Sequence, residues 1–143
     1  MYVDAQNLFS SAQAITVTAA SDNLIDLGSA VNLGTGQDVY VVVVVTTAFT
    51  DAGSDATVAV TVQTDTASTF GSATTAQTIG TLGAVSAAGA RLIAKLQKFT
   101  TAERYVRLYY TVADGPLTAG AVTAFLTVDV HDYTVYPDNI TIS

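Results

Sequence analysis

The chain has 143 residues, twelve acidic and five basic side chains, a net charge of −7 and no cysteine. This length suits a single domain, and the lack of cysteine excludes a disulfide framework, a zinc thiolate site and a thiol nucleophile. Because an acidic protein is repelled by phosphate backbones, the charge argues against nucleic-acid binding.

The composition predicts an all-β protein. Threonine (23), alanine (23) and valine (19) make up nearly half of the chain, which holds only one glutamate, two lysines and one methionine. β-branched residues favour the pleated, half-buried surface of a sheet, and helix formers are rare.

The first third of the chain contains an irregular start and two short strands. Residues 1–12 show no alternation and are predicted to form an extended N-terminal arm. Strands are expected at 14–19, with Ile15 and Val17 pointing inward, and at 24–28.

The segment 38–46 contains five consecutive valines, so both faces of this strand are apolar. On an open edge, such a strand would be a template for aggregation. We therefore expect it in the middle of a sheet, or with one face sealed by a partner.

The rest of the chain alternates apolar and polar residues, most clearly at 57–63, where the valines fall on one face. Further strands are predicted at 78–82, 90–97, 104–112 and 121–131. The segment 65–76 around Phe70 is expected to be a functional or semi-ordered loop, and residues 132–143 a C-terminal tail.

About eight short antiparallel strands separated by turn signals predict a β-sandwich, most simply a jelly roll. We expect residues 1–143 to form this single domain, flanked by the arm and the tail.

The sequence gives little support for catalysis or for a bound cofactor. His131 is the single histidine, and no serine lies in the elbow that a Ser-His-Asp arrangement needs. Asp51 and Asp55 share a loop with Gly53, but their spacing does not fit an EF-hand. The segment 34–36 lacks the lysine of a phosphate loop and the helix of a dinucleotide site. We expect no enzyme activity, no cofactor and no metal.

Neither a membrane span nor a signal peptide is expected. The longest apolar run, at 39–45, is too short to cross a bilayer as a helix. The first residues have no basic region followed by an apolar one.

The basic residues are concentrated in one window of the sequence, which contains a single acid, Glu103. They are Arg91, Lys95, Lys98, Arg104 and Arg107. This band could meet an acidic partner, or it could consist of ordinary solvated charges on two neighbouring strands.

Tyr105, Arg107 and Tyr109 form a row that alternation places on the outside of its strand. Tyrosine and arginine supply many of the binding hot spots at protein interfaces. Tyrosine rows also stack against sugars, so carbohydrate binding is the rival hypothesis. A third alternative is that the two tyrosines pack under a loop or under the tail.

Over most of its length, the chain resembles the small jelly-roll capsid cement, or decoration, proteins of tailed bacteriophages. The resemblance is carried by packing and turn motifs. They are Asp4–Gln6, Phe9–Ile15, Leu24–Gly28, Gly36–Val43, Val62–Asp65 with Phe70 downstream, Glu103–Tyr110 and Thr118–Ala124.

The resemblance implies a structural protein that is made in the host cytoplasm and binds the outer surface of the phage head. There it would clamp neighbouring subunits of the major capsid protein. Members of such families act as dimers or trimers, and the sequence does not choose between a homodimer and a homotrimer. No catalytic residue is carried over from the resemblance.

The residues expected at subunit contacts come from the arm, the outward row and the tail. They are Asp4, Gln6, Phe9, Tyr105, Arg107, Tyr109, Tyr133 and Tyr136. The alternative function is a carbohydrate-binding jelly-roll module of a phage fibre or an adhesin.

Overall fold

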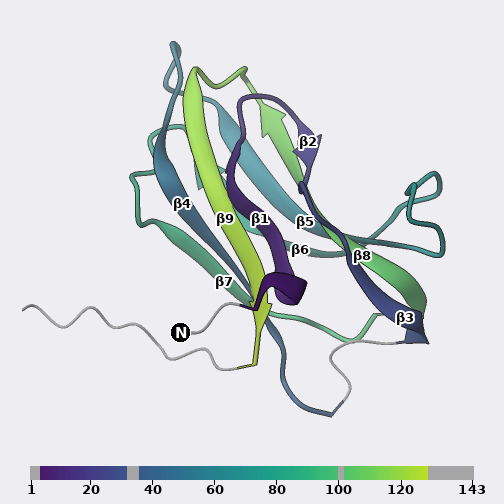
Figure 1. Cartoon of the computed structure of the whole chain (residues 1–143). Coiled ribbons are helices and arrows are strands. Elements are labelled where there is room, and N and C mark those ends of the chain that lie inside the picture. The colour runs from purple at the N-terminus through teal and green to yellow at the C-terminus, as the bar shows by residue number, and fades with distance from the viewer. Residues whose placement is uncertain (1–3, 32–35, 100–101, 129–143) are drawn as a thin grey trace, which may run out of the picture.

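The computed structural model describes residues 4–31, 36–99 and 102–128, and it consists of two β-sheets packed face to face (Figure 1). The elements of the described residues are η1 (Ala5–Asn7), β1 (Leu8–Ala14), β2 (Ala19–Ala20), β3 (Ile25–Val31), β4 (Tyr40–Thr50), β5 (Thr57–Asp65), β6 (Thr74–Gly83), β7 (Arg91–Lys95), β8 (Glu103–Ala113) and β9 (Ala119–Thr127). The predicted all-β sandwich is confirmed.

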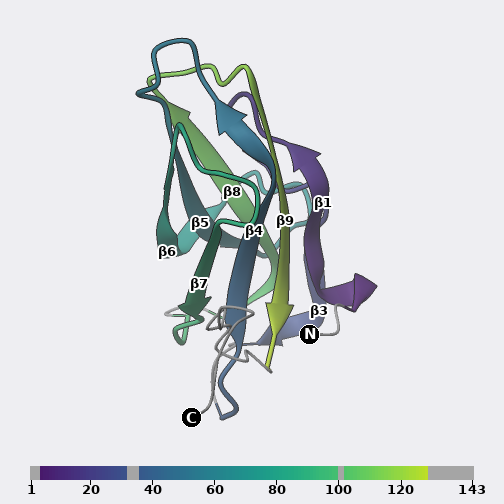
Figure 2. The same cartoon turned by 90° about the vertical axis from the view of Figure 1, so that its left-hand side faces the viewer.

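The strand order is that of a jelly roll. One sheet has the order β1-β9-β4-β7, and the other has the order β2-β8-β5-β6, with β3 also paired to β8. Because β2 and β3 both pair with β8, they share one strand position. Seen from the side, successive strands from β6 onward alternate between the two layers (Figure 2). The strand pairings of the described residues are all antiparallel, as this fold requires.

The core lies between the sheets and is built by the alternating strands. From β5, Val58, Val60 and Val62 are fully buried, and they join Val41 and Val43 of β4 in one apolar cluster. As predicted from its two apolar faces, β4 is central, between β9 and β7.

Val42 lies on the outer face of β4, yet it is also fully buried. Its register partners are Phe125 of β9 and Ile93 of β7. On the outer face of the sheet, Val42 therefore has an apolar neighbour on each adjacent strand.

The predicted arm over residues 1–12 is wrong from Leu8 onward, because β1 is a strand paired with β9. Its register shifts between Leu8 and Ser10 and again between Ser10 and Gln13. Such irregularities break the two-residue period, and Phe9 and Ser10 are consequently buried side by side. The strand therefore lacks the alternation by which sequence analysis detects strands.

The predicted strand at 14–19 is also wrong. β1 ends at Ala14 and β2 begins at Ala19, and the residues between them lead from one sheet to the other. Ile15 is buried as expected, but Val17 is 58% exposed. The predicted strand at 78–82 exists and is longer, because β6 starts at Thr74.

A buried polar network ties the irregular β1 to the opposite sheet. The hydroxyls of Ser10 and Tyr110 lie 2.8 Å apart, and Ser10 donates to Oε1 of Gln13 at 2.7 Å. Since the Ser10 proton is used in that bond, Tyr110 is the donor to Ser10. Burial raises the pKa of Tyr110 and so keeps this donor protonated.

Gly120, in β9, lies against the ring of Phe49, with no room for a side chain between them. Its φ is +154°, and an added Cβ would clash with the ring of Phe49, which is 2% exposed. We expect Gly120→Ala to lower the free energy of unfolding by about 1–3 kcal/mol, because a filled core absorbs an extra methyl poorly.

Gly71→Ala is the matched control, since no atom lies within 4 Å of its added Cβ. Urea titrations of both variants measure the difference, and equal stability of the two would contradict the packing argument.

Candidate functional site

The outer row, defined as Tyr105, Arg107 and Tyr109, lies on the outer face of the five-stranded sheet. These half-buried residues alternate along β8 with Val106, Leu108 and Tyr110, which are fully buried. The predicted outward direction of the row is confirmed, and β8 brings its three side chains together.

Arg107 is held in place by residues from two other parts of the chain. Its guanidinium lies 4.2 Å from the centroid of the Phe70 ring and 5.4 Å from that of Tyr109. Its Nε donates to Oε1 of Gln63 at 2.9 Å. A cation this close to an aromatic ring is attracted by the ring's quadrupole, and the hydrogen bond fixes the plane of the guanidinium.

The loop between β5 and β6 supplies Phe70, and Asp65 organises that loop. Oδ1 of Asp65 accepts from the backbone N–H of Ala67 at 3.1 Å and from the hydroxyl of Thr66 at 3.3 Å. Oδ2 accepts from the N–H of Ser72 at 2.8 Å. The donors of Ala67 and Ser72 lower the pKa of Asp65 because they stabilise its charged form.

Phe70 is 8% exposed although it lies in a loop. The sequence predicts a loop around this residue, and, as a separate alternative, tyrosines of the row that pack under a loop or under the tail. The Phe70 ring contacts the guanidinium of Arg107, the middle residue of the outer row.

Arg104, which precedes Tyr105 in β8, forms a bidentate ion pair with Asp26. Arg104 donates from Nε and Nη2 to the two carboxylate oxygens of Asp26, at 2.7 and 2.9 Å. The guanidinium also lies 5.1 Å from the centroid of the Tyr105 ring. The hydrogen bond from Arg104, together with the N–H of Gly28, lowers the pKa of Asp26 to about 2.

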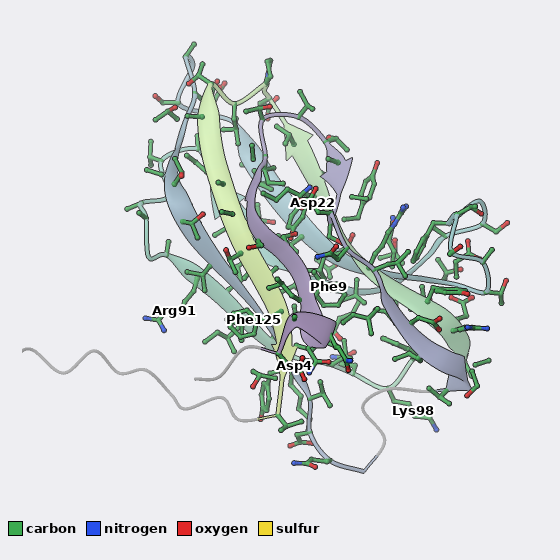
Figure 3. All side chains as sticks on the ribbon, in the orientation of Figure 1. Asp4, Phe9, Asp22, Arg91, Lys98 and Phe125 are labelled. Carbon is green, nitrogen blue, oxygen red and sulfur yellow. The ribbon has the colours of Figure 1, made fainter. Side chains whose placement is uncertain are left out.

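Asp4 and Gln6, two of the predicted contact residues, lie apart from the outer row. Both are exposed in or beside η1, where the Asp4 carboxylate accepts from the backbone N–H of Gln6 at 2.9 Å. η1 contacts β9 of the four-stranded sheet, and Figure 3 places Asp4 beside the end of that strand.

Phe9 must be removed from the candidate contacts. It is fully buried in the core cluster, because the bulged β1 turns it between the sheets. Tyr133 and Tyr136, with the predicted tail, lie outside the described residues.

The basic band does not form one surface. β7 carries Arg91 and Lys95 in the four-stranded sheet, whereas β8 carries Arg104 and Arg107 in the other. Figure 3 shows Arg91 and Lys98 at separate places on the molecule. The two strands are neighbours in sequence but not in space. Lys95 forms an ion pair with Asp38 at 2.8 Å.

An open hollow of about 510 Å³ lies among the loops that end β8 and precede β2. Its lining consists of Val17, Thr18, Val112, Asp114, Gly115 and Pro116. In the described ranges, no group of three or more His, Cys, Asp or Glu side chains is arranged to hold a metal ion. Within those same ranges, no helix is long and apolar enough to cross a membrane.

Comparison with known protein families gives a match over most of the chain. A family model described as Bbp16 matches residues 9–126, which run from β1 into β9 and so include both sheets. The name of this family indicates phage-related proteins. No curated protein matches the chain.

The Asp26–Arg104 pair makes stability depend on pH in a defined direction. Since the folded pKa of Asp26 is about 2 and an unfolded aspartate titrates near pH 4, the pair stabilises the fold fully above about pH 4. This stabilisation is lost as the pH falls from about 4 to about 2. We expect Asp26→Asn to be less stable than the natural chain at pH 7, with a difference that shrinks over this interval.

Chemical denaturation at several pH values measures that difference. Asp22→Asn serves as the control for the loss of one negative charge, because Asp22 is exposed and has no ion pair among the described residues. A deficit of Asp26→Asn that stays constant down to pH 2 would disprove the assignment.

Proposed function

This chain belongs to the Bbp16 family, and we propose that it is a structural cement protein of a phage particle. It binds the outer surface of the head and clamps neighbouring subunits of the major capsid protein. The phage-related family and the jelly-roll sandwich support this proposal, as does the resemblance to capsid cement proteins. In this role the protein performs no catalytic step and needs no cofactor and no nucleic-acid or membrane partner.

The main support for this role is the outer row, whose three side chains lie together on the five-stranded sheet. Tyr105, Arg107 and Tyr109 are partly exposed, and they are residue types that contribute strongly to protein interfaces. Arg107 is already fixed by Phe70 and Gln63. Side chains that are ordered before binding lose little conformational entropy when a partner docks, so more of the contact energy appears as affinity.

A clamp also needs a second contact on the same rigid body. The outer row lies on the five-stranded sheet, whereas Asp4 and Gln6 lie beside β9 of the other sheet. One subunit could therefore touch two capsid subunits at once. Two linked contacts of modest strength give durable attachment through their effective concentration. Self-association as a dimer or a trimer, which sedimentation equilibrium distinguishes, would multiply this effect.

The rival carbohydrate function fits the ring contacts less well. Sugars stack on free faces of aromatic rings, but arginines already approach the three rings of this surface. Arg107 lies over Phe70 and near Tyr109, and Arg104 lies near Tyr105. A sugar that stacks on the ring faces next to these arginines would have to displace the cations, whereas a protein partner can use the cations and the rings together.

The direct test is sedimentation of the purified protein with phage heads assembled without it. We expect the natural chain to sediment with the heads and the double variant Tyr105→Ala/Tyr109→Ala to bind at least about 30-fold more weakly, the loss typical of an interface hot spot. Thermal unfolding verifies that the variant is folded.

Tyr40→Ala, on the four-stranded sheet, is the control for loss of a half-buried strand tyrosine. Absence of head binding by the natural chain would refute the cement role. Reproducible binding on a glycan array, with a sugar-induced rise in melting temperature, would favour the rival.

A further inference from the structure

Arg107 differs from Arg104 and Lys95, because no acid pairs with it in the described part of the chain. Arg104 and Lys95 are each paired with an aspartate. Within the described ranges, the recorded hydrogen bond of Arg107 goes to the neutral amide of Gln63, and its ring contacts are to Phe70 and Tyr109. The half-buried guanidinium therefore keeps its full positive charge available to a partner.

The contacts of Arg107 leave one part of the guanidinium open. Phe70 covers a face of the group and Gln63 occupies the Nε edge. The N–H donors of Nη1 and Nη2 make no recorded hydrogen bond in the described part of the chain. These are the atoms with which arginine grips a carboxylate through two parallel hydrogen bonds.

Tyr105 and Tyr109 lie on either side of Arg107 along β8. Alternate residues of a strand lie on one face roughly 7 Å apart, so the three side chains are neighbours on the outer face of the sheet. Neither hydroxyl has a recorded hydrogen-bond partner among the described residues. A phenol donates one hydrogen bond, and a carboxylate bound by the guanidinium still has lone pairs to accept it.

We propose that Arg107, flanked by Tyr105 and Tyr109 and braced by Phe70 and Gln63, is a receptor for a carboxylate of the capsid partner, the side chain of an aspartate or glutamate. This inference rests on the proposed function and names the chemistry of the partner at the same surface. The planar fork of arginine matches the two oxygens of a carboxylate, and the net charge of −7 disfavours a nucleic-acid phosphate at this position.

Asp65 is a positioning residue for this receptor. It lies opposite Tyr105 in the register of β5 and β8, and it holds the loop that carries Phe70. Without its carboxylate, the loop loses the acceptors for the N–H groups of Ala67 and Ser72, and Phe70 is no longer fixed against Arg107. Asp65→Ala should therefore weaken the receptor although the charge of Arg107 is unchanged.

The first experiment compares Arg107→Met with Arg91→Met on heads assembled without the protein. Both variants replace an arginine by an unbranched side chain and remove one positive charge, but Arg91 lies on the opposite sheet. We expect Arg107→Met to bind at least about tenfold more weakly, as for the loss of a charge-assisted pair. Arg91→Met should stay within about twofold of the natural chain, and Arg107→Lys should be intermediate because lysine binds as a point charge.

The second experiment identifies the partner group. Heads whose surface carboxylates have been converted to amides should bind the natural chain more weakly, and on these heads Arg107→Met should show no further loss. Binding of the natural chain should also weaken as salt is raised, with a shallower dependence for Arg107→Met. If amidation leaves the difference between the two proteins intact, the carboxylate assignment is overturned.

A measurement without heads separates this inference from the cement role. Sodium acetate, compared with sodium chloride, should shift the NMR signals of the Arg107 guanidinium and the Tyr105 and Tyr109 rings, and Asp65→Ala should reduce these shifts. Shifts with inorganic phosphate but not with acetate would overturn the receptor, as would no acetate-specific shift. Head binding by the natural chain together with equal binding by Arg107→Met would refute the receptor and leave the cement role standing.

Discussion

The register between β5 and β8 is the constraint on which the rest of the molecule depends. The two strands pair without interruption from Thr57 opposite Ala113 to Asp65 opposite Tyr105. A slip of one residue would turn every side chain of one strand to the other face. If β5 slipped, its valines would leave the core, and if β8 slipped, the outer row would enter it. Burial of the valines therefore fixes the direction of the outer row.

The same register places Gln63 directly opposite Arg107, and this cross-strand pair makes the hydrogen bond that orients the guanidinium. The last paired residue of β5, Asp65, then gathers the backbone of the following loop and sets Phe70 against the same arginine. The position of Arg107 is thus fixed by the β5–β8 register, by the hydrogen bond to Gln63 and by the loop that carries Phe70. The surface is ordered because the core beneath it admits one pairing.

The sequence predicts the regular parts of this arrangement. Unbroken alternation identifies β5 and β8 with the correct inward faces, and the two-sided run of valines predicts the central position of β4. β1 escapes prediction because its bulges bury Phe9 and Ser10 consecutively, so the period of two is absent where the strand forms. Nothing in periodicity identifies the contact of Phe70 with Arg107, since that contact depends on how a loop folds back over the sheet. The hypothesis that the basic residues form one surface is wrong because the chain crosses from one sheet to the other between β7 and β8. Closeness in sequence does not show this crossing.

The net charge of the chain constrains how such a surface can work. An acidic protein repels an acidic partner at long range, but at physiological ionic strength this repulsion is screened beyond about 8 Å. Attraction at the outer row therefore acts only near contact, where Arg107 is partly shielded from water and its geometry is fixed by Phe70 and Gln63. Under these conditions, recognition depends on the fit of the contact more than on electrostatic steering. Such recognition suits a protein that must attach to many equivalent positions on a shell and avoid other charged molecules. A molecule without the complementary group is not attracted at long range and forms no favourable contact at short range.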